Sequence, residues 1–577
     1  MKNRELARIL GQIGDLEVMK DEPFKANAYR RAARIVEGLR EDVAGIAERR
    51  ELQDLQGIGK ALAKKIEEYV KTGKIAYLEK LRAEFPPGLL ELLHIPGVGP
   101  KTVKVLYQQL GVTSVEELER AARKGRIRKL RGFSKKSEEN ILNGLRTFSG
   151  AGKRALLGLG LPLAEELIEE LRTKCHIDRI SVAGSSRRMR ETVGDLDILV
   201  ASDEPEGVME AFVALPGVEE VIVSGPTKTS VIVERRNVEL QTTVRLQTDL
   251  RVVDAQSFGS ALQYFTGSKD HNIRLRRIAQ TKNWKLNEYG LFEGEKRIAG
   301  ETEEGIYEAL GMDFVAPELR EDRGEIEAAQ SDCLPGLIGL DDVKGDLHIH
   351  TEWSDGTESI ERMVEESKTL GYSYVSIADH SRGIKIAGGL DDDVLLEQVD
   401  AIKELNKREK GFKIFSSNEV NIKASGELDY DDEILQELDI VIGAVHSQFK
   451  MEKERMTDRI VTAMENEHVD FISHPTGRLI GKREPYEVDM DRIMDAALET
   501  NTALEINSWI DRLDLNDRDA RLAKERGVKL VLGTDAHTLG QMHFMRYGIG
   551  TARRGWLEPE DVLNTLPAKE LLAWFKS

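Results

Sequence analysis

Histidines and carboxylates gather in the last third of the 577-residue sequence, where eight of the eleven histidines follow residue 345. The motif GDLHIHTEWSDG, residues 345–356, separates two histidines by one residue and ends in an aspartate. On a strand this spacing places both imidazoles on the same face. Imidazole and carboxylate groups are ligands of Zn²⁺ and Mn²⁺ in proteins. The motif therefore predicts one edge of a metal site.

Further candidate ligands follow short apolar runs such as YVSIAD, LDIVIGAVH and KLVLGTDAH. The complete set is His348, His350, Asp355, His380, Glu419, His446, His474, Asp535 and His537. Nine ligands are too many for one tetrahedral ion and enough for a three-metal cluster. The alternative is a chance scatter of structural histidines, which the repeated position after apolar runs disfavours. His468 and His543 lack this position, and we interpret them as surface or supporting residues.

A second group of carboxylates lies in AGSSRRMRETVGDLDILV, residues 183–200. On a strand Asp195 and Asp197 share one face, where two carboxylates can hold one or two divalent cations. Two such cations orient a triphosphate and stabilise the attacking and leaving oxygens during nucleotidyl transfer. Asp249 in LQTDLRVV and Glu239 in VELQTTV are alternative third ligands, and we favour Asp249.

Residues beside the acidic pair are suited to bind phosphates. Gly184 and Ser185 offer backbone and hydroxyl donors, Arg188 adds positive charge, and Gly194 directly precedes the pair. A solvated strand face is the alternative for the two aspartates. It fits poorly with their position inside the apolar run LDILV.

Two Gly-x-Gly turns lie near the N-terminus. LQGIGKALAKKI contains Gly57 and Gly59, and IPGVGPKTVKVL contains Gly97 and Gly99. Glycines permit a tight turn, and the helix that follows presents free N–H groups to a backbone phosphate without reading base sequence. An ordinary turn between packed helices is the alternative for one copy. Two copies in a basic segment favour phosphate binding.

The apolar pattern predicts the elements that position these residues. Three- and four-residue spacing before residue 150 predicts helices, and β-rich runs between residues 178 and 255 predict a sheet. From Lys344 onward apolar strands alternate with helices, which is typical of parallel βα units. Most candidate ligands would then lie at the carboxyl ends of strands, where α/β barrels carry their chemistry.

Composition and charge exclude several classes of protein. No apolar run approaches the ~20 residues that span a bilayer, no export signal is visible, and two cysteines cannot form a disulfide framework. We therefore expect a cytoplasmic protein. The net charge is −19, yet residues 1–150 carry 30 Lys and Arg against 21 Asp and Glu, a net of +9. A basic segment on an acidic body indicates a partner with a phosphate backbone.

Residues 1–318 resemble family X DNA polymerases, the small gap-filling class, in their bacterial or archaeal form. Both glycine turns are similar to helix-hairpin-helix motifs, and YFTGSKDHNIRLR matches the nucleotide-pocket helix of this family. The resemblance implies that two adjacent aromatic rings exclude a ribose 2′-OH, an asparagine contacts the incoming nucleotide and an arginine reaches the template minor groove. The implied pocket residues are Tyr264, Phe265, Gly267, Asn272 and Arg276.

Three positions bear on how far this resemblance extends. Lys65 matches the family's Schiff-base lysine for removing 5′-deoxyribose phosphate, a reaction that needs an unprotonated amine. A phosphate-binding or solvated lysine is the alternative, and Ala61 stands where the family often has a phosphate-contacting lysine. Met189 stands where the family usually has glycine, a departure that bears on how the triphosphate approaches.

Residues 344–577 resemble the polymerase-and-histidinol-phosphatase (PHP) superfamily, a distorted (β/α)₇ barrel of phosphoesterases. The resemblance implies up to three Mn²⁺ or Zn²⁺ ions and no missing ligand. It assigns the first ion to His348, His350, Glu419 and Asp535, the second to Glu419, His446 and His474, and the third to Asp355, His380 and His537. It also implies a 3′–5′ exonuclease and endonuclease action at abasic sites.

We therefore expect a multidomain protein with a helical helix-hairpin-helix front, an α+β nucleotidyltransferase palm and thumb, and a C-terminal distorted (β/α)₇ barrel. The expected domains are a lyase-like DNA-binding domain at 1–85, a fingers-like helical domain at 86–150, a palm at 151–255, a thumb at 256–318, a linker at 319–343 and a PHP barrel at 344–577.

The expected function is DNA-directed DNA polymerisation that fills short gaps during repair, coupled to a metal-dependent 3′–5′ exonuclease. We expect two Mg²⁺ or Mn²⁺ ions in the polymerase site, gapped or primer-template DNA and dNTPs as partners, no membrane association and a monomeric state. The alternatives are a DNA-end binding module, a phosphatase of small metabolites such as histidinol phosphate, and a terminal or RNA-type nucleotidyltransferase. The intact ligand sets disfavour the first, and the YFTGS pocket disfavours the other two.

Overall fold

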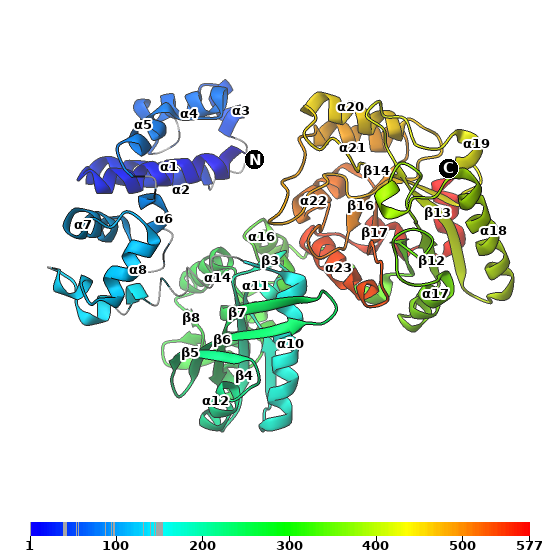
Figure 1. Cartoon of the computed structure of the whole chain (residues 1–577). Helices are drawn as coiled ribbons and strands as arrows, with labels where there is room; N and C mark the ends of the chain where they lie inside the picture. The colour runs from blue at the N-terminus through cyan, green and yellow to red at the C-terminus, as the bar shows by residue number, and fades with distance from the viewer. Residues whose placement is uncertain are drawn as a thin grey trace. The chain divides into compact units, whose positions relative to one another are not determined.

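The computed structural model describes residues 2–37, 43–53, 55, 57–86, 88–93, 95, 98–130, 132–138, 140–142, 145 and 154–577. The chain divides into two compact units, Met1–Lys153 and Arg154–Ser577. Figure 1 colours the first unit blue to cyan and the second cyan to red. Within the described ranges, every helix is too short or too polar to cross a membrane.

The described residues of the N-terminal unit form helices, as the apolar spacing predicts. These include α1 (Lys2–Met19), α2 (Pro23–Glu37), α3 (Val43–Glu48), α4 (Lys60–Thr72), α5 (Ala76–Ala83), α6 (Leu89–Leu92), α7 (Pro100–Leu110) and α8 (Val115–Arg123). Leu6, Leu10 and Ile13 of α1 are fully buried in the core of this unit. Helices α4 and α7 each begin directly after the second glycine of a Gly-x-Gly turn.

The second unit begins with a five-stranded sheet, which we call the palm sheet. Its strand order is β2 (Arg179–Val182), β4 (Asp195–Ala201), β7 (Thr242–Val253), β6 (Lys228–Asn237) and β5 (Val218–Ser224). Helices α10 (Leu157–Lys174) and α12 (Pro205–Val213) pack their apolar faces on it. Strands β4 and β7 run parallel although helix α12 and the hairpin of β5 and β6 separate them in the chain. This crossover brings distant residues into register.

A small mixed module follows the palm sheet. It contains α13 (Phe258–Thr266), α14 (Lys269–Thr281), the antiparallel strands β8 (Lys285–Asn287), β9 (Gly290–Glu293) and β10 (Lys296–Ala299), and α15 (Glu303–Leu310). Helix α16 (Glu325–Gln330) lies inside the segment expected to be a linker. His271 of α14 contacts Glu325 at 2.7 Å with both side chains fully buried. The segment is therefore a packed connection and not a free linker.

The C-terminal part contains seven parallel strands in sequence order. They are β11 (Gly345–Ile349), β12 (Tyr374–Ile377), β13 (Lys413–Asn421), β14 (Ile440–Ala444), β15 (Phe471–Ile472), β16 (Ala503–Asn507) and β17 (Leu530–Gly533). A parallel bridge between Ile349 and Ala536 brings the first and last strands together. The result is a nearly closed barrel, which confirms the predicted fold class.

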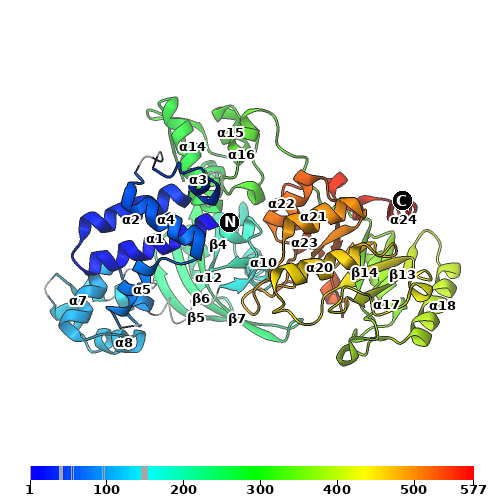
Figure 2. The same cartoon turned by 90° about the horizontal axis from the view of Figure 1, so that it is seen from above.

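Helices surround the barrel strands on the outside, as Figure 2 shows from a second direction. They are α17 (Ile360–Thr369), α18 (Asp392–Arg408), α19 (Asp432–Leu435), α20 (Lys453–Met464), α21 (Met490–Glu499), α22 (Asp517–Arg526), α23 (Met545–Arg554) and α24 (Ala568–Phe575). The buried faces of α17 to α23 and one set of strand residues form a large apolar core. Helix α24 packs with the alternate strand residues in a second, smaller cluster.

The palm and the barrel share an apolar contact. Ile510 and Leu513 of the barrel lie in the same buried cluster as Leu157 and Leu161 of α10. A Cβ atom at Gly158 would lie 2.2 Å from Cγ2 of Ile510, so only glycine permits this approach. Removing the barrel would expose these side chains to water, at a cost that scales with the apolar area uncovered.

A buried amide contributes to the seam that closes the barrel. Asn564 Nδ2 donates to the carbonyl oxygens of Gly345 on β11 and Leu532 on β17, each at 2.8 Å, and its Oδ1 accepts from the Leu532 N–H at 2.7 Å. Because these partners stay buried, Asn564→Ala should lower the free energy of unfolding by about 3 kcal/mol.

Urea unfolding followed by tryptophan fluorescence measures this loss. Asn237→Ala is the control, because the Asn237 side chain makes one hydrogen bond in a partly buried hairpin turn, where its Oδ1 accepts from the Leu240 N–H at 2.9 Å. An equal effect of the two substitutions would contradict the role of Asn564 in the seam.

Candidate active sites

The three acidic residues of the palm sheet come together. Asp195 and Asp197 lie on β4, and the parallel register pairs Asp197 with Asp249 on β7. Asp249 accepts hydrogen bonds from Gln247 Nε2 at 2.8 Å and contacts Lys228 Nζ at 3.0 Å. Glu239 lies elsewhere, in the turn between β6 and β7, where it accepts a 2.7 Å hydrogen bond from the Thr538 hydroxyl of the barrel.

The electrostatics of this acidic cluster favour added positive charge. Burial, followed by repulsion from Asp195 and Asp249, raises the pKa of Asp197 to about 7. Burial and the Asp249 carboxylate likewise raise the pKa of Asp195. Three carboxylates thus face one another with too little neutralising charge nearby. Three carboxylates supply the oxygen ligands that divalent cations such as Mg²⁺ prefer, and a bound cation would offset their repulsion.

The turn before the acidic pair is shaped around it. Gly184 has a positive φ of 63°. A Cβ atom there would lie 2.2 Å from Asp197 Oδ2, so glycine is required for the close approach. The Ser185 carbonyl accepts from the Arg190 N–H at 3.0 Å, which closes the turn. Gly194 precedes β4 and faces the Arg154 side chain.

Arg188 and Met189 follow in the same turn. Arg188 Nε donates to Glu321 Oε1 at 3.1 Å, and its Nη1 donates to the Thr266 carbonyl beside Gly267. Met189 adopts a left-handed φ of 52°, the conformation that glycine accommodates without strain. Its side chain packs on Gly550 of α23, so the methionine has a structural partner in the barrel.

The predicted nucleotide-pocket residues lie on α13 and α14. The Tyr264 and Phe265 rings meet edge to face at 5.1 Å, and the Arg251 guanidinium lies 4.3 Å from the centre of the Phe265 ring. Asn272 Nδ2 donates to the Tyr264 carbonyl at 2.7 Å. Arg276 Nε donates to the Asn272 carbonyl at 3.2 Å. The bond from Asn272 to Tyr264 joins α14 to α13.

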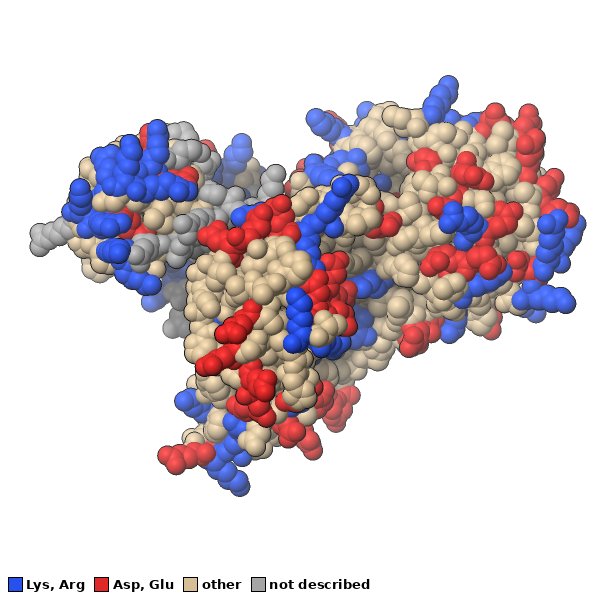
Figure 3. All heavy atoms as spheres, turned by 60° about the horizontal axis from the view of Figure 1, so that its bottom comes forward, with Lys and Arg blue, Asp and Glu red and all other residues tan. Residues whose placement is uncertain are grey.

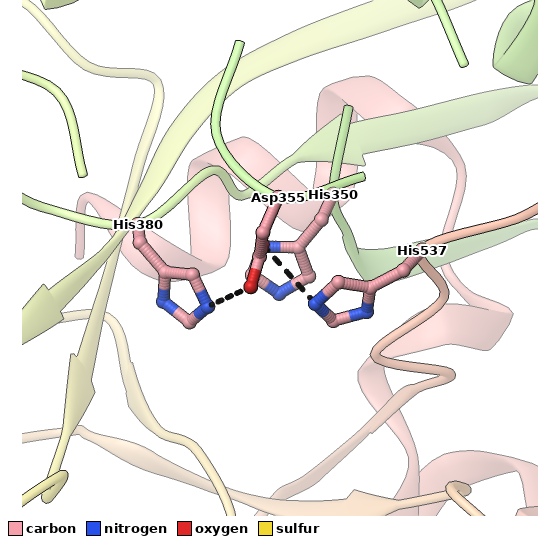
Figure 4. A group of neighbouring side chains, drawn as sticks. All are labelled: His350, Asp355, His380 and His537. Carbon is pink, nitrogen blue, oxygen red and sulfur yellow. Dashed lines mark ion pairs between the residues drawn. The ribbon is translucent and has the colours of Figure 1, made fainter. Parts of the chain in front are cut away.

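In the barrel, Asp355 connects two histidines at the end of the strands (Figure 4). Its Oδ1 lies 3.2 Å from His537 Nε2, and its Oδ2 lies 3.6 Å from His380 Nε2. Together with His350, their ligand atoms all lie within 4.8 Å of one another. His350, His380 and His537 follow three different strands, and Asp355 lies in the turn after β11, so the barrel topology brings the four residues together.

Glu419 of β13 and Asp535 are the other carboxylates in this cluster. Glu419 lies 2.8 Å from His380 Nδ1, 3.2 Å from His446 Nε2 and 2.8 Å from His474 Nε2. Two further groups have all their ligand atoms within 4.8 Å of one another. One is His348, His350 and Asp535, and the other is His380, Glu419 and His446.

The grouping differs in detail from the expected assignment. His350 lies in two groups, with Asp535 and with Asp355, and His380 lies near both Asp355 and Glu419. All nine expected side chains nevertheless converge at one end of the barrel. His543 stands apart, with its side chain 59% exposed and 3.4 Å from Glu366.

The barrel cluster has the chemistry of a metal site. Burial, then the neighbouring His537 and His380, lowers the pKa of His350 to about 3, which keeps its imidazole neutral. Burial alone would raise the pKa of Glu419, but the facing imidazoles of His446 and His380 hold it well below its usual range. Among the described residues, Nδ1 of His350, His446 and His474 is buried without a hydrogen-bond partner. Buried imidazole nitrogens without partners fit metal ions.

Sequence reasoning missed three carboxylates behind the ligands. Glu505 contacts His348 Nδ1 at 2.8 Å and accepts from the His474 N–H at 2.7 Å. Asp346 accepts from the His348 N–H at 3.1 Å, and Asp379 accepts from the Thr351 hydroxyl at 2.6 Å. Such groups orient ligand side chains. The sequence feature that could have identified them is an acidic residue within an apolar strand, as in GDLHIH, SIADH and ALEIN.

The loop after β16 borders the same cluster. Arg512 Nε lies 3.4 Å from Asp535 Oδ2, and the Trp509 ring lies 5.8 Å from the His537 ring. Ile510 of this loop is the residue that packs on the palm. One loop therefore contacts both the barrel cluster and the palm.

The N-terminal unit carries the proposed phosphate-binding turns. Gly57 has a positive φ of 109°, and Gly59 and Gly99 precede α4 and α7. Gly97 lies outside the described residues. The Lys65 ammonium lies 4.9 Å from the centre of the Tyr77 ring. Figure 3 shows lysines and arginines grouped on the visible face of this unit.

Family models match four segments of the chain. They are a helix-hairpin-helix domain at residues 1–75, a SAM-like helix-hairpin-helix tandem at 89–147, a DNA polymerase beta thumb at 261–321 and a PHP domain at 346–508. The DNA polymerase/3'-5' exonuclease PolX of Bacillus subtilis (strain 168) is 42% identical over 581 residues, which cover 100% of both chains. This chain belongs to the family X DNA polymerases that carry a PHP domain.

Two further relatives match separate parts of this family X chain. A probable phosphatase of Thermoanaerobacter sp. (strain X514) is 30% identical over 231 residues, which cover 38% of this chain and 89% of the relative. DNA polymerase lambda of Rattus norvegicus is 24% identical over 328 residues, which cover 52% of this chain and 53% of that protein.

Glu505 provides a test of the barrel cluster in this family X chain. Because its carboxylate orients His348 and His474, Glu505→Gln should weaken Mn²⁺ binding by roughly 10- to 100-fold. Calorimetric titration of the metal-free full-length chain with Mn²⁺ measures the affinity. Glu499→Gln, an exposed change at the end of α21, is the control. Equal affinities of the two variants would show that Glu505 does not support the ligands.

Proposed function

We propose that this chain is a DNA-directed DNA polymerase that fills short gaps in DNA and that its PHP barrel degrades DNA from 3′ ends. The observation that carries the proposal is identity of 42% along the entire length of a relative named for both activities. The assembly of the acidic cluster and the barrel cluster in one chain supports it, because each activity then has its own donor set.

The acidic cluster is the proposed polymerase centre. Asp195, Asp197 and Asp249 would hold two Mg²⁺ or Mn²⁺ ions, which when bound neutralise the triphosphate and stabilise the attacking and leaving oxygens. Ser185 and Arg188 would bind the phosphates from the adjoining turn. Gly184 keeps this turn within reach of Asp197 because no side chain intervenes.

The pocket helix provides the proposed selection of the sugar. Tyr264 and Phe265 would form the wall that excludes a ribose 2′-OH, and Gly267 would allow Arg188 to approach this wall. Asn272 and Arg276 would contact the incoming nucleotide and the template. The 2.7 Å bond from Asn272 to the Tyr264 carbonyl holds these groups in one arrangement.

The barrel cluster is the proposed nuclease centre. Its nine side chains would hold up to three Mn²⁺ or Zn²⁺ ions, which when bound activate water and neutralise charge on a phosphodiester. The neutral imidazole of His350 leaves a lone pair for such an ion. Glu505 and Asp346 restrain His348, so its orientation does not depend on the ion alone. The same chemistry would extend to abasic sites.

The N-terminal unit is the proposed grip on gapped or primer-template DNA. Its net charge of +9, from 30 basic and 21 acidic residues in 1–150, suits a phosphate backbone. Gly57, Gly59, Gly97 and Gly99 would let the backbone N–H groups after each turn approach a phosphate. We propose a monomer acting in the cytoplasm, with dNTPs as substrates.

Lys65 remains a predicted lyase residue. Its Nζ lies 4.9 Å from the centre of the Tyr77 ring. This contact does not identify a Schiff-base lysine, so the proposed function does not include lyase activity.

A phosphatase acting on small phosphate esters is the second candidate for the barrel. The relative that favours it is a probable phosphatase matching 38% of this chain. A comparison of small phosphate esters with recessed DNA ends distinguishes the two candidates. Faster hydrolysis of the small esters would favour the phosphatase.

Separation of the two activities is the main test. Asp195→Ala should abolish nucleotide addition on one-nucleotide-gapped DNA while 3′-end degradation persists, because the acidic cluster serves only the polymerase. His446→Ala should have the opposite effect. A labelled primer, with and without dNTPs in Mg²⁺ and Mn²⁺, reports both activities. Loss of both activities in either correctly folded variant would contradict two separate centres.

Salt dependence tests the proposed DNA grip. Lys60 and Lys101 are exposed in the first turns of α4 and α7. If each neutralises one phosphate, their double alanine variant should reduce the slope of log affinity against log salt by about 1.8. Fluorescence anisotropy with gapped duplex DNA at several KCl concentrations measures the slope. The control, Lys403→Ala with Lys407→Ala on α18 of the barrel, should retain the wild-type slope.

A further inference from the structure

A buried arginine of the barrel contacts the phosphate-binding turn of the palm. Arg554, at the end of α23, has a side chain that is 4% exposed. Its Nη1 donates to the Arg188 carbonyl at 2.8 Å and to Glu321 Oε1 at 3.0 Å. One guanidinium of the barrel therefore holds both the backbone of Arg188 and the carboxylate that pairs with the Arg188 side chain.

The Glu321 carboxylate contacts two arginines of the palm turn in addition to Arg554. Its Oε1 lies 3.1 Å from Arg188 Nε and 3.7 Å from Arg190 Nη1. Burial alone would raise the pKa of Glu321, but Arg554, followed by Arg188 and Arg190, lowers it. The carboxylate is therefore charged, and it attracts the same Arg188 guanidinium that would bind a triphosphate.

Arg554 is itself held from the barrel side. Its Nη2 donates to Asp517 Oδ2 at 2.8 Å, and the same oxygen contacts Arg323 at 3.0 Å. The two arginines counter the effect of burial and lower the pKa of Asp517 to about 2. The guanidinium is therefore fixed at the first residue of α22 and cannot easily follow movements of the palm turn.

The same turn has a second contact with α23. Met189, in its left-handed conformation, packs against Gly550, where an added Cβ atom would lie 2.5 Å from Met189 Cε. Consecutive residues of the palm turn thus contact one barrel helix, through a carbonyl at 188 and a side chain at 189. No contact of this kind is needed to bind metal in the barrel.

We propose that Arg554 of the PHP barrel is a positioning residue of the polymerase site, which holds Arg188 ready for the triphosphate of the incoming nucleotide. This inference rests on the proposed polymerase function. Two effects act in the same direction. Arg554 shares the charge of Glu321, which weakens the hold of that carboxylate on Arg188, and it anchors the Arg188 carbonyl. Without Arg554, Glu321 competes more strongly with the triphosphate.

The test is steady-state filling of a one-nucleotide gap by the full-length chain at varied dNTP concentration. Arg554→Gln should raise the KM for dNTP roughly five- to tenfold and leave kcat within about twofold. The control is Arg546→Gln, on the same helix, because Arg546 pairs with Glu165 of α10 at 2.7 Å and joins palm and barrel away from the turn. Its KM should equal that of the wild type.

A second variant separates positioning from a general loss of structure. Adding Glu321→Gln to Arg554→Gln removes the competing carboxylate and should recover most of the lost dNTP affinity. Degradation of 3′ ends by each variant reports whether the barrel is intact. An unchanged KM in Arg554→Gln, or no recovery in the double variant, would overturn the positioning role. Failure of the wild-type chain to add any nucleotide would instead overturn the proposed function, and this inference with it.

Discussion

The mutual repulsion of closely placed carboxylates is the physical constraint on which the C-terminal unit depends. Asp195 and Asp197 lie on β4 and Asp249 lies on the neighbouring strand β7 in the interior of the palm sheet, and burial together with repulsion raises the pKa of Asp197 to about 7. Like charges at this separation destabilise one another unless cations are present. Bound divalent cations would remove this repulsion, so the arrangement is suited to a metal site. The palm supplies the rigid strands that hold it.

In the barrel, the repulsion between carboxylates is offset by neighbouring histidines. Glu419 and Asp535 face imidazoles, which hold their pKa values well below the usual range. Behind the ligands, Glu505 and Asp346 bond to histidine nitrogen and backbone N–H groups. The carboxylates behind the candidate ligands thus orient them, as in metal sites whose ligands are restrained before the ion binds. The large apolar core of the barrel fixes both sets.

Carboxylates at the interface between palm and barrel are also neutralised by neighbouring positive charges. Glu321 pairs with Arg188 of the palm and Arg554 of the barrel. Asp517 pairs with Arg554 and with Arg323 of the connecting segment. Apolar packing of Ile510 against Gly158 brings the parts close enough for these ion pairs to form. A polymerase turn and a barrel helix therefore belong to one network, although their metal clusters are separate. Two activities in one chain can influence each other through such contacts.

The sequence by itself determined the features that depend on local spacing, because period-two residues on one strand share a face whatever the strand contacts. It predicted the paired aspartates at 195 and 197, the histidines at 348 and 350 and the alternation of strands and helices in the barrel. Only the tertiary structure decided which distant group joins them. The sequence favoured Asp249 over Glu239 but left both open, and the parallel pairing of β4 with β7 places Asp249, and not Glu239, beside Asp197. Segment 319–343 packs because Glu325 meets His271 across 54 residues, and Arg554 reaches the palm across 366 residues. No local pattern records such pairings, since they depend on how strands and domains are arranged in space.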